Sequence, residues 1–444
     1  MARAIYIETY GCQMNLADTE LLLGHLARHG IRRVPSAGEA DVILLNTCAI
    51  REHAEERVVG RLTQLLEHKR RASHVKLGIV GCMAQHHRER LLDRLPFLDL
   101  ILGPDEYRKL PGLCGEAGFD DPLVEVRLGR EETYADIVPA REDGVRAWVT
   151  IMRGCDRFCT FCIVPFVRGR ERSLPLPLVL DQVRQAAAGG YREVVFLGQT
   201  VNAYRDRQLG FADLLRATAR LDGIERIRFT SPHPSDVNEE MIEVMATEPK
   251  ICPQIHLPLQ SASDSVLERM ERGYTIEEYD RLVRRLRDAV PGIELSTDVI
   301  VGFPGEREED FRATRDYVAR VGYDSAFLFA YSRRDGTRAG RWPDDVSPED
   351  KRTRLAELIE LQEGISAARG RAWRGRTVEV LVEGPARRQV GWLAGKSREF
   401  RTTVFPSSGQ LPGELVSVRV EDSTAHTLIG RTCGIDAEKE AAVG

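Results

Sequence analysis

The sequence contains no apolar run near the ~18 residues that a membrane-spanning helix needs, and this absence excludes a helical membrane protein. The first residues, MARAIYIETYG, also lack the basic segment, apolar core and small-residue cleavage site of a signal peptide. We therefore expect a cytoplasmic protein, in a reducing compartment where disulfides are rare. The nine cysteines of the chain then need an explanation other than disulfide bonding.

The chain also lacks a strong net charge. Its formal charge is −5 at pH 7, which argues against an overall basic nucleic-acid binder. Positive charge is concentrated locally instead, because nine Lys or Arg residues and only three Glu lie between Arg369 and Arg401. This segment indicates a polyanionic partner.

The length of 444 residues suits roughly two or three domains. The first part, which we place at 1–117, alternates short apolar runs with amphipathic segments: AIYIETYGC, ADVILLNTC and VKLGIVGC are each followed by a helical pattern. This alternation predicts an α/β domain with a parallel sheet covered by helices.

Each of those three apolar runs ends on a cysteine: Cys12, Cys48 and Cys82. Parallel strands end at the same edge of a sheet and neighbouring strands lie only ~4.8 Å apart, so the three thiols should meet at one edge. Taken singly, each is best explained as a buried thiol. Their recurrence at three successive strand ends favours a shared inorganic centre.

The rest of the chain divides into a linker at 118–144, a second βα series at 145–370, an all-β segment at 371–435 and a tail at 436–444. The second series contains six strand-like runs, from RAWVTIM to SAFLFAYS. It predicts a partial, TIM-like (β/α)6 barrel with its chemistry at the carboxyl ends of the strands. The all-β segment predicts a small five-stranded, OB-like barrel of a kind that often binds nucleic acid.

Cys155, Cys159 and Cys162 form a CxxxCxxC motif directly after the first strand of the second series. A structural zinc site generally has four ligands in two pairs, and no second pair stands nearby at that spacing. Three thiolates suit a cubane iron-sulfur cluster with one open iron. A structural zinc site and a chance cluster are the alternatives.

This motif resembles that of the radical S-adenosylmethionine superfamily. Within it, the chain resembles the methylthiotransferase family from end to end, through TYGCQMN, NTCAI, VGCMAQ, MRGCDRFCTFCIVPFVRGRERS, LGQTVNAY, HLPLQSASDSVLERMERGYT, STDVIVGFPGE and FAYSRRDGT. YGCQMN and GCDRFCTFCIVPFVRGRE are most similar to the branch that methylthiolates isopentenylated adenosine in tRNA.

The resemblance implies two 4Fe-4S clusters, one on each cysteine triad, and S-adenosylmethionine as cofactor. It implies that a radical formed from the cofactor activates carbon 2 of the adenine next to the anticodon and that sulfur from the second cluster is attached there. It also implies that the C-terminal barrel is an RNA-binding TRAM domain. We expect the cofactor pocket to be lined by Phe161, Gln199, Ser231, Gln260, Asp298 and Phe329.

Arginines follow the CxxxCxxC motif, and a solvated loop is their ordinary explanation. Their closeness to the reactive centre favours contacts with substrate phosphates. Together with the basic C-terminal segment, this predicts an RNA-binding set: Arg168, Arg170, Arg172, Arg374, Arg376, Lys396 and Arg398.

The expected partners are a tRNA that carries isopentenylated adenosine and an electron donor such as flavodoxin or ferredoxin; we expect a monomer. Two other functions stay open. One is the neighbouring methylthiotransferase branch, which modifies an aspartate of a ribosomal protein. The other is a non-catalytic iron-sulfur protein with an RNA-binding tail, which leaves the six-unit barrel around an open cluster without a purpose.

Overall fold

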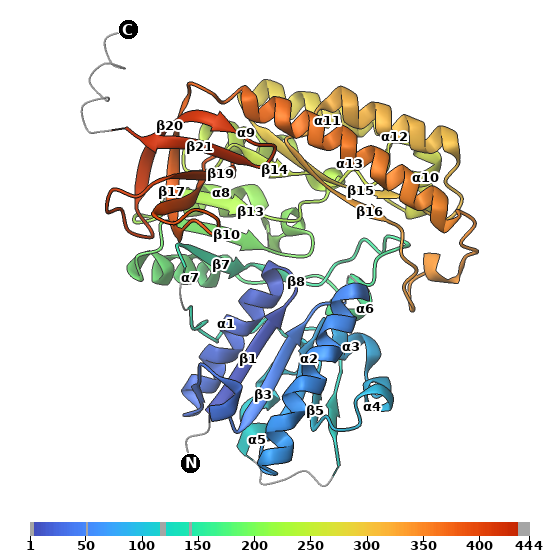
Figure 1. Cartoon of the computed structure of the whole chain (residues 1–444), viewed down its shortest axis with the longest axis vertical. Helices are drawn as coiled ribbons and strands as arrows, with labels where there is room; N and C mark the ends of the chain where they lie inside the picture. The colour runs from blue at the N-terminus through green and yellow to red at the C-terminus, as the bar shows by residue number, and fades with distance from the viewer. Residues whose placement is uncertain (1–3, 50–51, 116–120, 142–143, 434–444) are drawn as a thin grey trace.

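The computed structural model describes residues 4–49, 52–115, 121–141 and 144–433, which form three parts (Figure 1). The expected tail at 436–444 and the linker positions 118–120 and 142–143 lie outside the described residues. In the described part of the chain, no helix has the length and apolar character needed to cross a membrane.

The N-terminal domain is a six-stranded parallel sheet in the order β2-β1-β3-β4-β5-β6, which confirms the predicted α/β class. Its last strand, however, lies within 118–144, the segment predicted as a linker, because β6 pairs with β5 and extends the sheet. All six residues of the strand VILLNT are buried, because helices cover both faces of the sheet. The strands are β1 (Ala4–Tyr10), β2 (Arg32–Arg33), β3 (Val42–Thr47), β4 (Lys76–Gly81), β5 (Leu100–Leu102) and β6 (Leu123–Glu125). The helices are α1 (Gln13–Arg28), α2 (Glu52–Arg71), α3 (Cys82–His87), α4 (Arg90–Arg94) and α5 (Leu110–Gly115).

The predicted partial barrel is also confirmed. It consists of two parallel three-stranded sheets, β13-β10-β7 and β14-β15-β16, which a parallel bridge between Ile227 and Ile251 connects. The strands are β7 (Arg146–Thr150), β10 (Glu193–Leu197), β13 (Arg226–Phe229), β14 (Gln254–His256), β15 (Glu294–Val301) and β16 (Ser325–Ala330). The outer helices are α7 (Leu176–Ala188), α8 (Phe211–Ala219), α9 (Glu239–Thr247), α10 (Asp264–Met270), α11 (Ile276–Ala289), α12 (Glu308–Val321) and α13 (Pro348–Arg371).

Helix α1 of the N-terminal domain packs against the first strands of the barrel. Met14 and Ala17 form one buried cluster with Val195 and Leu197 of β10, and Cys12 packs against this cluster. Because these residues are near the carboxyl ends of the strands, the sheet edge of the N-terminal domain faces the mouth of the barrel (Figure 1).

The C-terminal segment folds into a closed five-stranded barrel in the order β17-β18-β19-β21-β20, which confirms the all-β prediction. Its strands are β17 (Thr377–Pro385), β18 (Trp392–Ser397), β19 (Thr402–Pro406), β20 (Leu415–Ser423) and β21 (Thr427–Thr432). It packs on the beginnings of the barrel strands, away from the mouth: Arg226, fully buried at the start of β13, donates to the carbonyl oxygens of Lys396 and Glu379, each at 2.8 Å.

Candidate active site

The CxxxCxxC cysteines lie in a loop between β8 (Met152–Arg153) and α6 (Val164–Arg168). Gly154 starts the loop at φ +81°, and a Cβ atom there would lie 1.9 Å from the carbonyl oxygen of Arg170, so only glycine fits. The amide of Cys155 donates to the carbonyl of Gly169 at 3.1 Å, and that of Cys162 donates to the carbonyl of Cys159 at 2.9 Å. The backbone therefore fixes the shape of this loop.

Polar side chains contact the sulfurs of this first triad. Thr200 Oγ1 lies 3.1 Å from Cys155 Sγ, and Arg272 Nη1 donates to Cys159 Sγ at 3.4 Å. Burial raises the pKa of Cys162 to about 12 and also raises the pKa of Cys155. The thiolate form at this triad therefore depends on a compensating positive charge, which a bound metal centre supplies.

The second triad lies at the carboxyl edge of the N-terminal sheet, as the strand-end spacing predicts. Cys12 begins α1 after β1, Cys48 follows β3, and Cys82 begins α3 directly after β4. These three strands are direct neighbours, because β1 pairs with β3 and β3 pairs with β4, both in parallel. The fold therefore brings together cysteines that are 70 residues apart at their extremes.

Two buried asparagines hold the sheet edge that carries the second triad in place. Asn15 Nδ2 donates to Asn46 Oδ1 at 3.1 Å, and Asn46 Nδ2 donates to the carbonyl of Asn15 at 2.9 Å. The Oδ1 atom of Asn15 also accepts from the Cys12 amide at 3.3 Å and from Cys12 Sγ at 3.4 Å. Asn15, the last residue of YGCQMN, thus ties the first cysteine to strand β3.

The thiols of the second triad differ in acidity. A hydrogen bond with Cys48 lowers the pKa of Cys12 to about 6, although burial opposes this shift. Burial raises the pKa of Cys82, and the positive charge of Arg168 opposes that shift. None of the nine cysteines, all of which lie in described ranges, forms a disulfide.

Both triads open into one cavity of about 280 Å³ at the mouth of the barrel. All six cysteines line it, together with apolar side chains and with several polar and charged ones. The apolar side chains include Met14, Ala49, Ile163, Val164 and Val167. We call this space the central cavity.

The residues present fit two iron-sulfur clusters. Each triad offers three thiols to one space, and the wall of the central cavity contains buried donors that have no hydrogen-bond partner in the described structure: Arg168 Nη2 and His233 Nε2. Burial, together with the positive charges of Arg272 and Arg157, lowers the pKa of His233 to about 2, so the imidazole is neutral. These unpaired N–H donors beside the grouped thiols fit a bound ligand that offers sulfur and other acceptor atoms.

Three of the six predicted cofactor contacts line the central cavity: Gln199, Ser231 and Asp298. Gln199 Oε1 accepts from the Gly154 amide at 2.5 Å, which joins the end of β10 to the start of the cysteine loop. Ser231 has φ +58°, a left-handed backbone conformation that is uncommon outside glycine. Asp298 pairs with His256, with 3.2 Å between its Oδ2 and the imidazole Nε2.

The other three, Phe161, Gln260 and Phe329, are not among the described residues that form the wall of this cavity. Phe161 packs edge-on against Phe303 in a separate apolar cluster. Gln260 is 7% exposed, and its Oε1 is buried with no hydrogen-bond partner in the described structure. Their cofactor contacts stay predictions.

The sequence analysis missed seven polar residues on the wall: Gln13, Arg157, Thr200, Thr230, His233, His256 and Arg272. For most of them the signal was a polar residue at or just after the end of a barrel strand or in the cysteine loop, but Arg272 lies in the turn between α10 and α11 and had no such signal. The linear sequence does not tell which of the many polar residues in such positions turn inward.

The structure corrects the predicted role of Arg168 and Arg172. Their exposed fractions are 3% and 7%, and both are held in ion pairs, Arg168 with Asp18 and Arg172 with Asp105. Neither guanidinium reaches the surface, so both have an internal role in place of the predicted contact with phosphates. Arg170 is exposed and pairs with Asp156.

The basic residues of the C-terminal barrel divide into two groups. Arg374 and Arg376 are exposed, and Arg376 lies over the ring of Trp373. Lys396 and Arg398 turn toward the partial barrel: burial lowers the pKa of Lys396, and Arg398 Nη2 donates to the carbonyl of Ile251 at 3.4 Å. The second pair therefore joins two domains and leaves less positive charge for RNA than the sequence predicts.

Comparisons with known proteins cover all three parts of the chain. Residues 149–318 match the Radical SAM superfamily, residues 4–103 match the Uncharacterized protein family UPF0004, and residues 371–432 match the TRAM domain. Among solved structures, the radical S-adenosylmethionine methyltransferase TsrM from Kitasatospora setae is similar with a TM-score of 0.60 and 18% identity, over 77% of each chain. This likeness shows the fold.

Curated relatives are similar over almost their whole length. A tRNA-2-methylthio-N(6)-dimethylallyladenosine synthase of Chlorobium luteolum is 47% identical over 98% of both chains. A protein of the same name in Carboxydothermus hydrogenoformans is 44% identical over 96% of this chain and 99% of the relative. Another, in Porphyromonas gingivalis, is 44% identical over 96% of this chain and 94% of the relative. Together with the two cysteine triads around one cavity, these matches show that the chain belongs to the tRNA-2-methylthio-N(6)-dimethylallyladenosine synthase family of radical S-adenosylmethionine enzymes.

Proposed function

We propose that this protein attaches a methylthio group to carbon 2 of N(6)-dimethylallyladenosine in tRNA. The observation that carries this proposal is the central cavity, which both cysteine triads line in a chain of this family. A reaction that joins sulfur to a carbon activated by a radical needs both centres to face the same substrate atom.

In this proposal, Cys155, Cys159 and Cys162 would hold a cluster that, reduced by a donor such as flavodoxin or ferredoxin, would supply the electron for cleavage of S-adenosylmethionine. Cys12, Cys48 and Cys82 would hold the cluster associated with the sulfur, whose methyl group would come from a separate S-adenosylmethionine. The protein itself positions the two triads and shields the reacting atoms from water. Its sheet edge and its barrel mouth present the two triads to one space, and the apolar side chains that line this space exclude water from the reacting atoms.

Specific side chains then prepare each triad for its ligand. Arg272 and Thr200 contact sulfurs of the first triad, and Arg168 contacts Cys82 of the second. Hydrogen bonds of this kind orient metal ligands and stabilise their thiolate form. Gln199 and Ser231, just after β10 and β13, and Asp298, within β15, complete the wall that we assign to the cofactor.

Mass spectrometry of tRNA nucleosides tests this function. We expect cells that lack the gene to accumulate dimethylallyladenosine and to lose its methylthio derivative, and a plasmid copy to restore the derivative. A copy with Cys12→Ala, Cys48→Ala and Cys82→Ala is the matched control and should not restore it. Unchanged tRNA nucleosides, together with a lost methylthio group on a ribosomal-protein aspartate, would assign the protein to the neighbouring branch.

RNA binding should depend on the exposed arginines of the C-terminal barrel. We expect Arg374→Ala with Arg376→Ala to weaken tRNA binding and to flatten its dependence on salt by about 0.9 in slope for each lost phosphate contact. The control is Arg284→Ala with Arg312→Ala, which removes the same charge from exposed positions on the outer helices α11 and α12. Equal slopes for the two double variants, measured by titration from low to moderate salt, would place the RNA elsewhere.

A further inference from the structure

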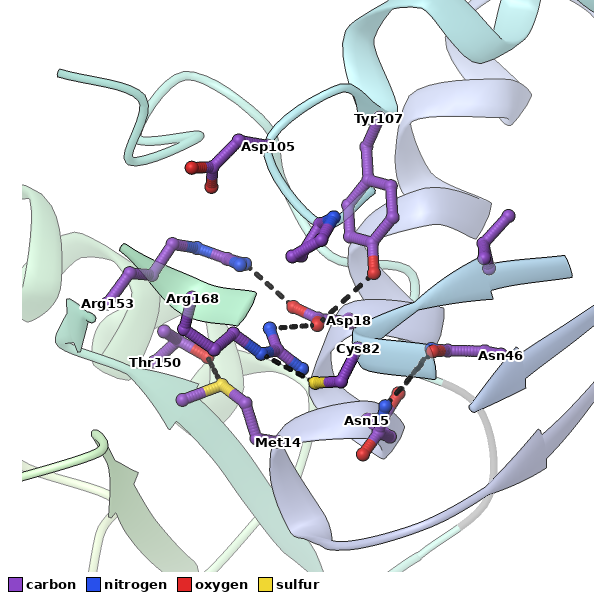
Figure 2. A network of polar contacts seen from close by, with 12 residues as sticks. Met14, Asn15, Asp18, Asn46, Cys82, Asp105, Tyr107, Thr150, Arg153 and Arg168 are labelled. Atoms are coloured by element: carbon purple, nitrogen blue, oxygen red, sulfur yellow. Dashed lines mark hydrogen bonds and ion pairs between the residues drawn. The ribbon is translucent and has the colours of Figure 1, made fainter. Parts of the chain in front are cut away.

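A buried network of charges connects the N-terminal domain to the cysteine loop of the barrel (Figure 2). Its centre is Asp18 on helix α1, which is fully buried. Asp18 Oδ1 accepts from Arg153 Nη2 at 2.8 Å, and Asp18 Oδ2 accepts from Arg168 Nη1 at 2.5 Å and from the hydroxyl of Tyr107 at 3.4 Å. Two arginines of the barrel thus share one carboxylate of the neighbouring domain.

The charges in this network do not balance. Arg153 and Arg168 carry two positive charges against the single negative charge of Asp18, and both arginines are at most 3% exposed. The adjacent pair of Arg172 and Asp105 is balanced within itself. An uncompensated buried charge is strongly unfavourable, so the network is complete only with a further negative group nearby.

The position of Arg168 shows where that negative group belongs. Arg168 Nε donates to Cys82 Sγ at 3.0 Å, and its Nη2, also buried, has no hydrogen-bond partner in the described residues. Arg153 contacts Asp18 and lies over the ring of Tyr134, at 4.9 Å from the ring centre, and its Nε and Nη1 are also buried without a partner in the described residues. The contact with Cys82 is therefore what distinguishes Arg168. Figure 2 shows the guanidinium of Arg168 between Asp18 and Cys82, with that of Arg153 on the far side of Asp18.

We infer that Arg168 is a positioning residue for the second iron-sulfur cluster: it orients the Cys82 sulfur and stabilises added negative charge on the cluster, which raises the reduction potential. The inference rests on the proposed function, which places a cluster on Cys12, Cys48 and Cys82. Hydrogen bonds to ligand sulfurs and nearby charge are two of the main factors that set the potential of such clusters.

The network also explains how the positive charge of Arg168 is held beside Cys82. Asp18 holds the Nη1 side of Arg168, so the planar guanidinium presents Nε to Cys82 in a fixed direction. Asp18 and Cys82 belong to the N-terminal domain and Arg168 belongs to the barrel. The contacts of Arg168 therefore hold the two domains together and place its charge beside the Cys82 sulfur at the same time. A lysine at this position has the charge but lacks the planar fork that reaches both partners.

The test measures the midpoint potential of the second cluster by redox titration, with electron paramagnetic resonance as the readout. The full chain with Cys155→Ala, Cys159→Ala and Cys162→Ala isolates that signal after anaerobic reconstitution. In this background we compare Arg168→Gln, Arg168→Lys and Arg153→Gln. Arg153→Gln is the matched control, because it also removes one buried positive charge and one ion pair with Asp18.

We expect a shift to more negative potential in Arg168→Gln, a smaller shift in Arg168→Lys, and the smallest in Arg153→Gln, whose guanidinium lies beyond Asp18. Equal shifts in Arg168→Gln and Arg153→Gln, or none in Arg168→Gln, would overturn the role of Arg168. If Arg168→Gln takes up no iron, the shift in midpoint potential of Arg168→Lys is compared with that of Arg153→Lys, and equal shifts would again overturn the role of Arg168. Absence of iron from the background protein itself would refute the cluster assignment of the proposed function, so the two failures are distinguishable.

Discussion

The protein with Cys155→Ala, Cys159→Ala and Cys162→Ala is expected to lose cleavage of S-adenosylmethionine entirely and to contain half the iron of the unaltered protein. The unaltered protein should contain about eight iron atoms after anaerobic reconstitution, because each triad accounts for one four-iron cluster. The loss is complete because the open iron that binds the cofactor exists only at this triad. Iron analysis and an assay for 5′-deoxyadenosine measure the two quantities.

The other triad provides the matched control. Cys12→Ala, Cys48→Ala and Cys82→Ala should also halve the iron, yet some cofactor cleavage should remain, because these cysteines lie on a separate sheet in the N-terminal domain. Loss of all iron in either triple variant would mean that the two sites load as one unit. A content of one or two metal ions in the unaltered protein, as for zinc, would contradict both clusters.

Much of this architecture can be predicted from the sequence, because its signals are local and periodic. The apolar runs that end on Cys12, Cys48 and Cys82 predict parallel strands, and parallel strands that are neighbours must bring their ends together. The six-unit barrel and the five-stranded C-terminal barrel follow from the same alternation of apolar and polar residues.

The roles of the arginines cannot be predicted in this way. Arg168, Arg170 and Arg172 alternate in one short segment, and the pattern alone makes them look equivalent. In the structure two of them are buried and one is exposed, because the buried pair meets Asp18 and Asp105 from a domain more than sixty residues earlier in the chain. A charged residue has no local signal for a partner at that distance.

The same limit applies to the basic C-terminal segment. The local surplus of positive charge indicates a polyanion, but part of it is used inside the protein: Arg401 pairs with Glu294 and Asp324 of the partial barrel. The acidic residues that take up this charge are dispersed through the second domain. Net charge over a segment therefore predicts the presence of a charged partner without telling whether that partner is RNA or a neighbouring domain.

The substrate preference is expected to be the other large effect: tRNA with dimethylallyladenosine should react at least hundreds of times faster than tRNA with unmodified adenosine. The lining of the central cavity includes the apolar side chains of Met14, Ile163, Val164 and Val167. Burial of a five-carbon prenyl group there contributes roughly 0.8 kcal/mol for each methylene-sized unit, several kcal/mol in all. Each ~1.4 kcal/mol of this stabilisation corresponds to a factor of ten in the ratio of the two rates.

A tRNA with a threonylcarbamoyl group should not react, because the apolar side chains that we assign to the prenyl group offer its carboxylate no partner. The cations on the cavity wall are held elsewhere: Arg157 and Arg168 form ion pairs with Asp236 and Asp18, and Arg272 contacts Cys159. The measurement compares the three tRNAs side by side with the reduced, fully loaded enzyme and follows the methylthio product. Val164→Ala is the matched variant: it removes apolar surface from the wall without altering charge, so it should lower the ratio of prenylated to unmodified rates. Equal rates on the prenylated and unmodified tRNAs would show that the prenyl group does not contact these apolar side chains. A preference for the threonylcarbamoyl form would show that one of the arginines on the cavity wall binds the substrate carboxylate.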